Sequence, residues 1–251
     1  MKNYNKEDAL KIIIDVAIEY EERLRDNHFL IIYSQNNRIN AVQVGFRDSN
    51  YLHMTGVKSR LSAPVFYDSC IKRKLSERDF EIDKNGRAQQ KLMVLPYLPD
   101  LLYNNCMSGN FINSGICIKA DYFVGNTKAV LSVGFRTGKS IDFPVTLYNE
   151  DIRKLTQPTC KVLAIFRKEY NEKYYMKCTY LSKGQDMNKL LLLEAVNKLI
   201  RIDDDIEALD SNNEKVVLEV PLEPDEIQAL EEGRRDREEN GTIPHEAINW
   251  D

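Results

Sequence analysis

The segment around His53 holds the residue types that proton-transfer chemistry needs. It reads Phe-Arg-Asp-Ser-Asn-Tyr-Leu-His-Met-Thr-Gly over residues 46–56, so a hydroxyl and a glycine follow one of the chain's three histidines within three positions. An imidazole exchanges protons near neutral pH and can serve as a general base or acid. Thr55 could bind phosphate or orient the imidazole, and Gly56 could let a substrate approach the backbone. The alternative is structural: a hydrogen-bonded histidine followed by a turn.

Cations close to this segment suggest a substrate that carries phosphate. Lys58 and Arg60 follow it directly, and a guanidinium can bind phosphate through two hydrogen bonds. Lys91, together with Arg136 and Lys139 in a predicted loop, could be brought toward the histidine by a sheet. Solvation of an ordinary surface is the alternative explanation for such pairs.

Other features give weaker signals. Tyr67 could offer a stacking face or a hydroxyl, although burial in the core is the commoner role of such a tyrosine. The stretch Gly134-x(3)-Gly138-Lys139-Ser140 is one residue shorter than a phosphate-binding loop. None of the five cysteines are spaced as Cys-x-x-Cys, and neither His-Glu-x-x-His nor Gly-x-Ser-x-Gly occurs. We therefore predict no metal site and no cofactor.

The elements that would position these residues run from helix to sheet. Residues 5–25 have apolar side chains at helical spacing behind a capping asparagine, Asn5. Two strands are predicted over 29–34 and 39–46, which would leave His53 just past the end of the second one. This order indicates an α+β fold, with the N-terminal helix packed on an antiparallel sheet and a helical C-terminal extension. The other predicted elements are helices over 63–74 and 150–155, a broken helix over 92–106, strands over 116–119, 128–135, 140–146, 161–168 and 174–181, and a long helix over 188–208.

Charge divides the chain into a basic body and an acidic end. Residues 1–190 carry 29 Lys and Arg against 21 Asp and Glu, a net charge of +8, whereas residues 191–251 carry 6 against 18, a net charge of −12. A basic body suits a nucleic-acid enzyme, and an acidic end can compete with nucleic acid for it; better solubility is the plain alternative. No basic-then-apolar leader and no apolar run of membrane length occur. This predicts a cytoplasmic protein with reduced cysteines and no membrane contact.

Residues 46–56 resemble the signature Phe-x(4)-Phe-x-His-Leu-Thr/Leu-Gly of the fourth phage-type family of barnase/EndoU/colicin/RelE-like (BECR) nucleases, with Tyr51 in place of Phe and Met54 in place of Leu. Further similar blocks follow in the family's order, over about residues 5–182. The resemblance implies a toxin-like endoribonuclease of phage or mobile-element origin. Such an enzyme would cut RNA by 2′-hydroxyl attack, without a metal, and leave a 2′,3′-cyclic phosphate. From the residue types and this resemblance together, the predicted catalytic residues are His53, Thr55, Lys58 and Arg60, and the predicted RNA contacts are Lys91, Arg136, Lys139 and Tyr67.

The C-terminal end resembles a different class of protein, the ends of RelB-type and YefM-type antitoxins. The similar residues are 230–233, Gly241, Ile243, Pro244, His245 and Glu246, with one residue fewer between Gly241 and Ile243 than in those proteins, and chance similarity is the alternative. We divide the chain into a BECR-like nuclease domain (1–185), a connecting helix (186–210) and an acidic antitoxin-like tail (211–251) that could restrain the nuclease. The expected partners are RNA and either an antitoxin-like protein or the chain's own tail. The rival hypothesis is a non-catalytic interaction or regulatory protein of the toxin–antitoxin type on the same scaffold.

Overall fold

The N-terminal helix α1 (Lys6–Arg23) begins at the predicted cap. In the computed structural model, which describes residues 3–112, 120–126, 130–191 and 194–201, the Oδ1 atom of Asn5 accepts a hydrogen bond from the N–H of Asp8 at 2.8 Å. One face of the helix is buried through Ala9, Ile13, Val16, Ala17 and Tyr20. The helical spacing of the apolar residues predicts this face, which packs toward the sheet that follows.

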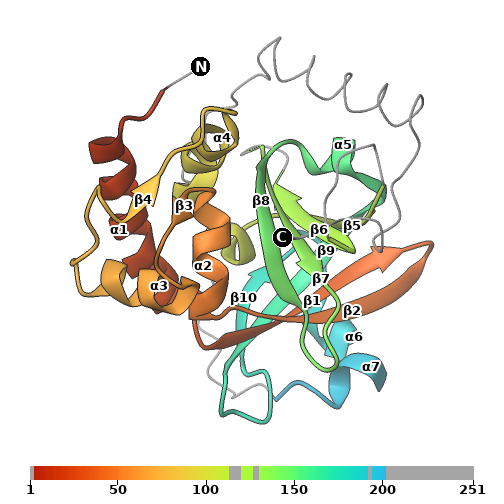
Figure 1. Ribbon diagram of the computed structural model, residues 1–251. Helices are drawn as coiled ribbons and strands as arrows, with labels where there is room; N and C mark the ends of the chain where they lie inside the picture. Colours follow the sequence, from red (N-terminus) through yellow and green to blue (C-terminus); the bar gives the residue numbers. More distant parts are fainter. Residues whose placement is uncertain (1–2, 113–119, 127–129, 192–193, 202–251) are drawn as a thin grey trace.

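Eight antiparallel strands form one sheet beside this helix (Figure 1). Their order is β2-β1-β9-β5-β6-β7-β8, and β10 pairs with the edge of β9 that faces away from β1. The long strand β9 joins the two halves of the sheet, because its first half pairs with β5 and its second half with β1. The strands are β1 (Asn27–Gln35), β2 (Arg38–Gly45), β5 (Met107–Phe111), β6 (Tyr122–Asn126), β7 (Leu131–Arg136), β8 (Phe143–Asn149), β9 (Thr156–Glu169) and β10 (Lys177–Leu181).

The two ends of this strand order come together. Asp142, just before β8, accepts a hydrogen bond from the N–H of Gly45 in β2 and donates its own N–H to the carbonyl of Gln43, both at 2.9 Å. Val44 and Asp142 form a parallel bridge at the same place. The sheet therefore curls until the start of β8 returns to β2.

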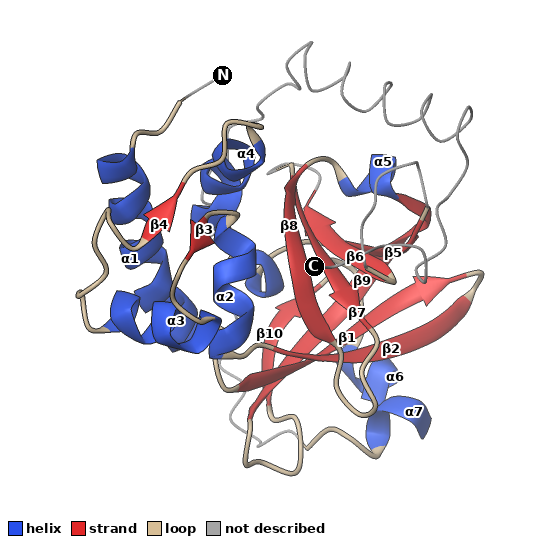
Figure 2. Cartoon of the chain, viewed as in Figure 1, coloured by secondary structure: helices blue, strands red, loops and turns tan. Residues whose placement is uncertain are grey.

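Further helices lie with α1 on one side of the sheet (Figure 2). The main core fills the space between these helices and the sheet face that carries Phe29 and Ile31. Within it the rings of Tyr20, Tyr51 and Tyr67 meet edge to face, with centroids 5.0 to 5.7 Å apart. The elements on this side are α2 (Asp48–Thr55), α3 (Ala63–Ile71), α4 (Arg87–Val94), the 3-10 turns η1 (Leu95–Tyr97) and η2 (Leu101–Tyr103), and a small two-stranded antiparallel sheet of β3 (Lys58–Ser59) and β4 (Phe80–Glu81).

Shorter helices cover the opposite face of the sheet. The side chains of Leu190 and Val196 pack in one cluster with Leu30 and Phe166 of the sheet, and α5 packs against Phe123 in another. The helices are α5 (Ile152–Leu155), α6 (Met187–Leu191) and α7 (Glu194–Asn197). Among the described helices, none has both the length and the apolar character needed to cross a membrane.

The expected α+β class, with an N-terminal helix on an antiparallel sheet, is confirmed, but the sequence does not predict β5 or β6. Gly125-Asn126 is predicted as a turn, yet both residues lie inside β6. A Cβ atom on Gly125 would come within 2.5 Å of the Ser132 hydroxyl and 2.7 Å of the Leu131 carbonyl oxygen. The glycine is there because β7 approaches the backbone closely, not because the chain turns.

The long helix predicted over 188–208 is interrupted in the structure. Helix α7 ends at Asn197, a turn follows, and Ile200 forms a bridge with Tyr175. Ile200 is buried with Leu190 in the same cluster, so this segment folds back onto the sheet. The strand predicted over 116–119, the remainder of the long helix and the tail over 211–251 lie outside the described residues.

Candidate active site

His53 lies on a helix, and the prediction that it sits just past the end of a strand is wrong. The chain leaves β2 and enters α2 where the N–H of Arg47 donates to the Oδ1 atom of Asn50 at 2.9 Å. Tyr51 and Met54, three residues apart, point into the core and fix the inward face of the helix. The side chain of His53 is exposed on the last turn of α2, where solvent or a ligand can reach the imidazole.

Helix α2 is held against strand β8 (Figure 1). The Nδ2 atom of Asn50 donates to the main-chain carbonyl of Pro144 in β8 at 3.2 Å. Within the described residues, one side of strand β8 pairs with β7, and the other side has no strand partner beyond the bridge of Asp142, just before β8, with Val44 of β2. The helix that carries His53 therefore packs beside an edge strand of the sheet.

Lys91 of α4 reaches the backbone of the histidine. Its Nζ atom donates to the main-chain carbonyl oxygen of His53 at 2.8 Å. Carbonyl groups in the last turn of a helix have no partner within the helix and carry partial negative charge, which an ammonium group satisfies. Burial, and then the charge of Arg87, lower the pKa of Lys91 to about 8. The sequence predicts Lys91 as an RNA contact, and the structure places it next to His53.

Gly56 makes this contact possible. It ends α2 in the left-handed conformation, with φ at 73°, which a residue with a Cβ atom adopts at a cost. A Cβ atom here would lie 2.7 Å from Cδ of Lys91 and 3.2 Å from Cα of Ala88. The missing side chain thus lets the stem of Lys91 cross the end of the helix.

Thr55 is fully buried, and its hydroxyl serves the end of the helix. The Oγ1 atom donates to the carbonyl of Leu52 at 2.8 Å and accepts from the N–H of Val57 at 3.3 Å. A hydroxyl used in this way holds the turn after His53 and does not face solvent.

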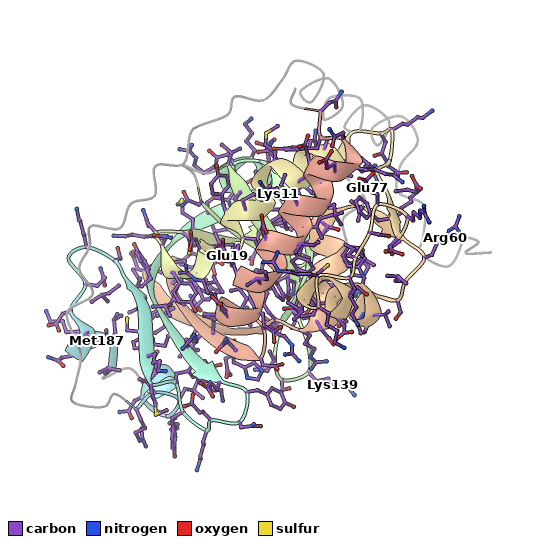
Figure 3. The ribbon with its side chains drawn as sticks, turned by 90° about the vertical axis from the view of Figure 1, so that its left-hand side faces the viewer. Lys11, Glu19, Arg60, Glu77, Lys139 and Met187 are labelled. Carbon is purple, nitrogen blue, oxygen red and sulfur yellow. The ribbon has the colours of Figure 1, made fainter. Side chains whose placement is uncertain are left out.

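The two cations that follow His53 in sequence are exposed. Lys58 forms an ion pair with Asp83 at 3.0 Å, and its side chain is 73% exposed, so the pair is weak. Arg60 projects from the surface of the molecule (Figure 3).

The second basic pair lies at the other end of α2. Arg136 is the last residue of β7 and pairs in register with Phe143, next to Pro144, where Asn50 docks. Lys139 is in the loop that follows, and its side chain projects into solvent (Figure 3). Cations therefore flank α2 at both ends, with Lys91 at the C-terminal end.

Tyr67 is buried in the core, where it cannot stack on a base. Its hydroxyl donates to the carboxylate of Glu21 in α1 at 2.7 Å, and only 3% of the residue is exposed. Burial and the bond to Glu21 raise the pKa of this phenol far above its usual range.

Sequence reasoning did not single out Arg87, although it lies four residues before Lys91 on the same helix. The sequence does show two positive charges four residues apart. How far Arg87 lowers the pKa of Lys91, however, depends on burial, which only the structure shows. Within the described ranges, no group of three or more His, Cys, Asp or Glu residues is arranged to hold a metal ion.

A curled antiparallel sheet with four helices on one face and an exposed histidine at the end of one of them defines an α+β domain with a candidate acid–base site. Residues 12–184 match the model of the family described as phage-Barnase-EndoU-ColicinE5/D-RelE like nuclease 4. The chain belongs to this family, which places it among nucleases of the BECR type. No curated protein and no solved structure matches the chain.

Proposed function

We propose that the protein is a metal-independent endoribonuclease in which His53 transfers protons and Lys91 stabilises charge on the substrate phosphate. The observation that carries the proposal is the position of the Lys91 ammonium, 2.8 Å from the backbone of an exposed histidine. Membership of a nuclease family supports the same assignment. A proton-transfer group and a cation are among the groups that cleavage of a phosphodiester requires.

The reaction uses the 2′-hydroxyl of RNA as the nucleophile. A base removes its proton as the 2′-oxygen bonds to phosphorus, the bond from phosphorus to the 5′-oxygen breaks, and the leaving oxygen takes up a proton. The products are a 2′,3′-cyclic phosphate and a free 5′-hydroxyl. His53 can accept the first proton as the base or donate the second as the acid, because its imidazole is exposed and exchanges protons near neutral pH.

Lys91 is suited to the charge that develops on phosphorus. An ammonium group has three donors, and the carbonyl of His53 uses one of them. With a pKa of about 8, the amine is mostly protonated at neutral pH and keeps its charge without full hydration. Such partly desolvated cations act strongly on a transition state.

The remaining predicted residues take secondary roles in this proposal. Lys58, Arg60, Arg136 and Lys139 are exposed cations that contact the RNA backbone on either side of the site. Thr55 is a positioning residue that holds the turn after His53. Tyr67 has a structural role through Glu21.

The experiment compares RNA and DNA of the same base sequence, incubated with the protein in the presence of excess EDTA. The proposal predicts cleavage of the RNA alone, with 2′,3′-cyclic phosphate ends. Absence of RNA cleavage over a panel of sequences, both by the full chain and after deletion of residues 211–251, would favour the non-catalytic regulatory protein.

The acidic end is proposed to restrain the nuclease, as in a toxin carried with its own antitoxin-like segment by a phage or mobile element. The support is the opposite net charge of the two parts, +8 over residues 1–190 and −12 over residues 191–251. A polyanionic segment competes with RNA for the same cations.

A further inference from the structure

A second histidine lies on β1, an interior strand of the sheet between β2 and β9. His28, the second residue of β1, pairs in register with Gly45 of β2 on one side and with Lys168 of β9 on the other. Its imidazole is half-buried over Gly45: a Cβ atom on that glycine would lie 2.9 Å from Cδ2 and 3.2 Å from Nε2 of the ring. The glycine thus leaves the space that the ring occupies.

The imidazole has an exposed aromatic neighbour. The ring of Tyr170, in the loop after β9, meets it edge to face with centroids 5.3 Å apart and an interplanar angle of 70°. Tyr170 is 61% exposed, the largest such fraction among the exposed large hydrophobic side chains of the described residues. An exposed tyrosine fixed at its edge by a second ring offers a free face to a planar ligand.

Charge around His28 is predominantly positive. Burial, Lys168 and Arg47 lower the pKa of the imidazole, and only Asp26 acts in the opposite direction. Asp26 already pairs with Arg25 at 3.3 Å. Within the described part of the chain, neither Arg47 nor Lys168 forms an ion pair with a carboxylate. The ammonium group of Lys168 donates to the main-chain carbonyl of Lys173 at 3.3 Å and lies 5.0 Å from the centre of the Tyr175 ring, contacts that leave its positive charge without a carboxylate partner. Two cations near an imidazole, neither paired with a carboxylate, favour an anion.

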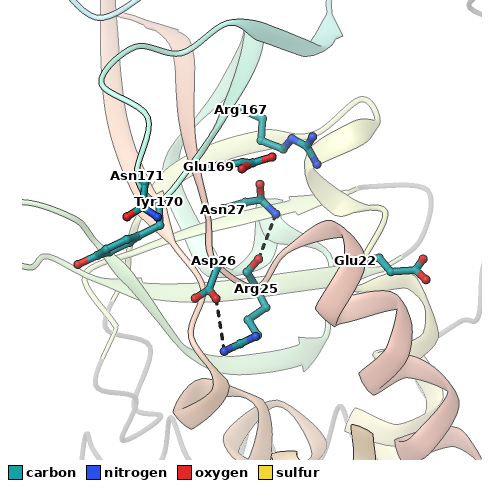
Figure 4. Close-up of a pocket in the computed structure, with 8 residues that line it drawn as sticks. All are labelled: Glu22, Arg25, Asp26, Asn27, Arg167, Glu169, Tyr170 and Asn171. Carbon is teal, nitrogen blue, oxygen red and sulfur yellow. Dashed lines mark hydrogen bonds and ion pairs between the residues drawn. The ribbon is translucent and has the colours of Figure 1, made fainter.

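Tyr170 also lines a pocket of mixed charge (Figure 4). Its volume is about 440 Å³, and its lining combines Tyr170 with two arginines, two asparagines and three carboxylates. Asn171 supplies an amide group there, whereas the Nδ2 atom of the nearly buried Asn27 already donates to the main-chain carbonyls of Arg25 at 3.1 Å and Arg23 at 3.5 Å. Amides and carboxylates hydrogen-bond to the edges of bases, whereas carboxylates repel phosphate. Tyr170 therefore contacts the imidazole of His28 and also lines a pocket that has groups able to hydrogen-bond to a base.

We propose that His28, Arg47, Lys168 and Tyr170 form a second nucleotide subsite, which holds an RNA phosphate on the side of His28 and the adjoining base against Tyr170. The subsite deepens the proposed ribonuclease function and rests on it for the identity of the ligand. Arg47 immediately precedes α2, and the six residues from Arg47 to His53 span about 9 Å at the helical rise. Arg47 is thus the member of the subsite that lies at the start of the helix that carries His53, and a bound strand that contacts Arg47 can continue along α2 to His53.

The test is binding of a short single-stranded 2′-O-methyl RNA, which lacks the nucleophile, to the full chain, measured by fluorescence anisotropy at several salt concentrations. Lys168→Ala should weaken binding and reduce the slope of log Kd against log salt concentration by about 0.7, the value for one phosphate contact on a single strand. The matched control is Lys161→Ala, which removes an exposed lysine from the same strand at a position outside the subsite; it should leave the slope within about 0.2 of the wild-type value.

The second part of the binding test replaces Tyr170 in two ways. Tyr170→Ala should weaken binding about 5-fold or more, which corresponds to loss of one base–aromatic stack, and Tyr170→Phe should keep wild-type affinity. The proposal is overturned if the oligonucleotide does not bind, or if Lys168→Ala and Tyr170→Ala bind it as Lys161→Ala does.

NMR titration of His28 gives a readout that a purely structural histidine would not change. A phosphate beside the ring favours its protonated form, so saturation with the oligonucleotide should raise the pKa of His28. If the pKa does not rise, no phosphate binds beside His28.

Failure of the subsite can be told from failure of the proposed function. If binding depends on Lys168 and Tyr170 but no RNA is cleaved, the subsite is supported and the ribonuclease function is rejected. If RNA is cleaved but binding does not depend on these residues, the ribonuclease function is supported and the subsite is rejected.

Discussion

The ammonium group of Lys91 lies 2.8 Å from the main-chain carbonyl oxygen of His53, so a side chain of α4 closes the end of the helix that carries the histidine. The contact ties together two segments 38 residues apart in sequence. It depends on Gly56, since any larger residue there would meet the stem of the lysine. The exposed imidazole and the partly desolvated cation are therefore positioned by one local arrangement.

Replacing Lys91 should impair catalysis more than folding. Lys91→Gln removes the charge and should lower kcat for RNA cleavage on the order of 10²-fold, as for loss of one transition-state donor. Lys91→Arg keeps a cation and should retain more activity. Lys84→Gln, which removes an exposed lysine seven residues earlier, is the control and should cleave like the wild type. Equal activity of the Lys91→Gln and Lys84→Gln variants would show that Lys91 does not act on the substrate.

Gly56→Ala should destabilise the protein by roughly 1–3 kcal/mol, measured by urea denaturation, because a left-handed backbone and a close contact are both penalised. Gly184→Ala is a matched control. Gly184 has nearly the same φ, 77°, but nothing within 4 Å of the position of a Cβ atom. The excess cost at Gly56 reports the contact with Lys91 and Ala88. If the two variants are equally destabilised, the close packing at the end of α2 is not significant.

The lowered pKa of Lys91 predicts how stability depends on pH. Between a pKa of about 8 in the folded protein and 10.5 in the unfolded chain, the unfolded state binds more protons at this residue. The free energy of unfolding should therefore rise with pH across this interval, relative to a Lys91→Met variant that cannot titrate. Urea denaturation of both proteins below pH 8 and near pH 10 gives the comparison. If the difference in the free energy of unfolding between the two proteins is the same at both pH values, Lys91 is not buried as described.

Much of the scaffold could be predicted from the sequence because its signals are local. The capping side chain of Asn5 and the apolar spacing behind it specify α1. The two apolar runs on either side of Asn36-Asn37 specify the hairpin of β1 and β2. Pro96 and Pro99 predict the broken helix between α4 and β5, where the structure has two 3-10 turns.

The errors arise where distant contacts decide the local structure. The spacing of Tyr51 and Met54 already fits a helix, but whether the segment continues β2 depends on Asn50 docking on Pro144, 94 residues away. Gly125 of β6 suggests a turn in the sequence, and only the close approach of β7 explains it. Likewise the sequence contains Lys91 and His53, but their proximity is a product of tertiary packing.

Deletion of residues 211–251 should raise the rate of RNA cleavage if the acidic end restrains the basic body. The ratio of the rates of the truncated and full-length proteins should fall as salt rises, because the Debye length shortens from about 10 Å at 0.1 M to about 3 Å at 1 M. Cleavage assays over this range of ionic strength measure the ratio. Equal rates at low salt would exclude restraint by the tail, and a ratio independent of salt would point to apolar docking through residues such as Ile243 and Trp250.

The most direct measurement is RNA cleavage by a His53→Ala variant in EDTA, with product ends analysed. Because the side chain is exposed, the variant should keep the wild-type melting temperature to within about 2 °C. Loss of the proton-transfer group should lower kcat about 10²- to 10⁴-fold, and added imidazole should restore part of it. Cleavage at the wild-type rate, with the same 2′,3′-cyclic phosphate ends, would contradict the assignment of His53 as the group that transfers protons.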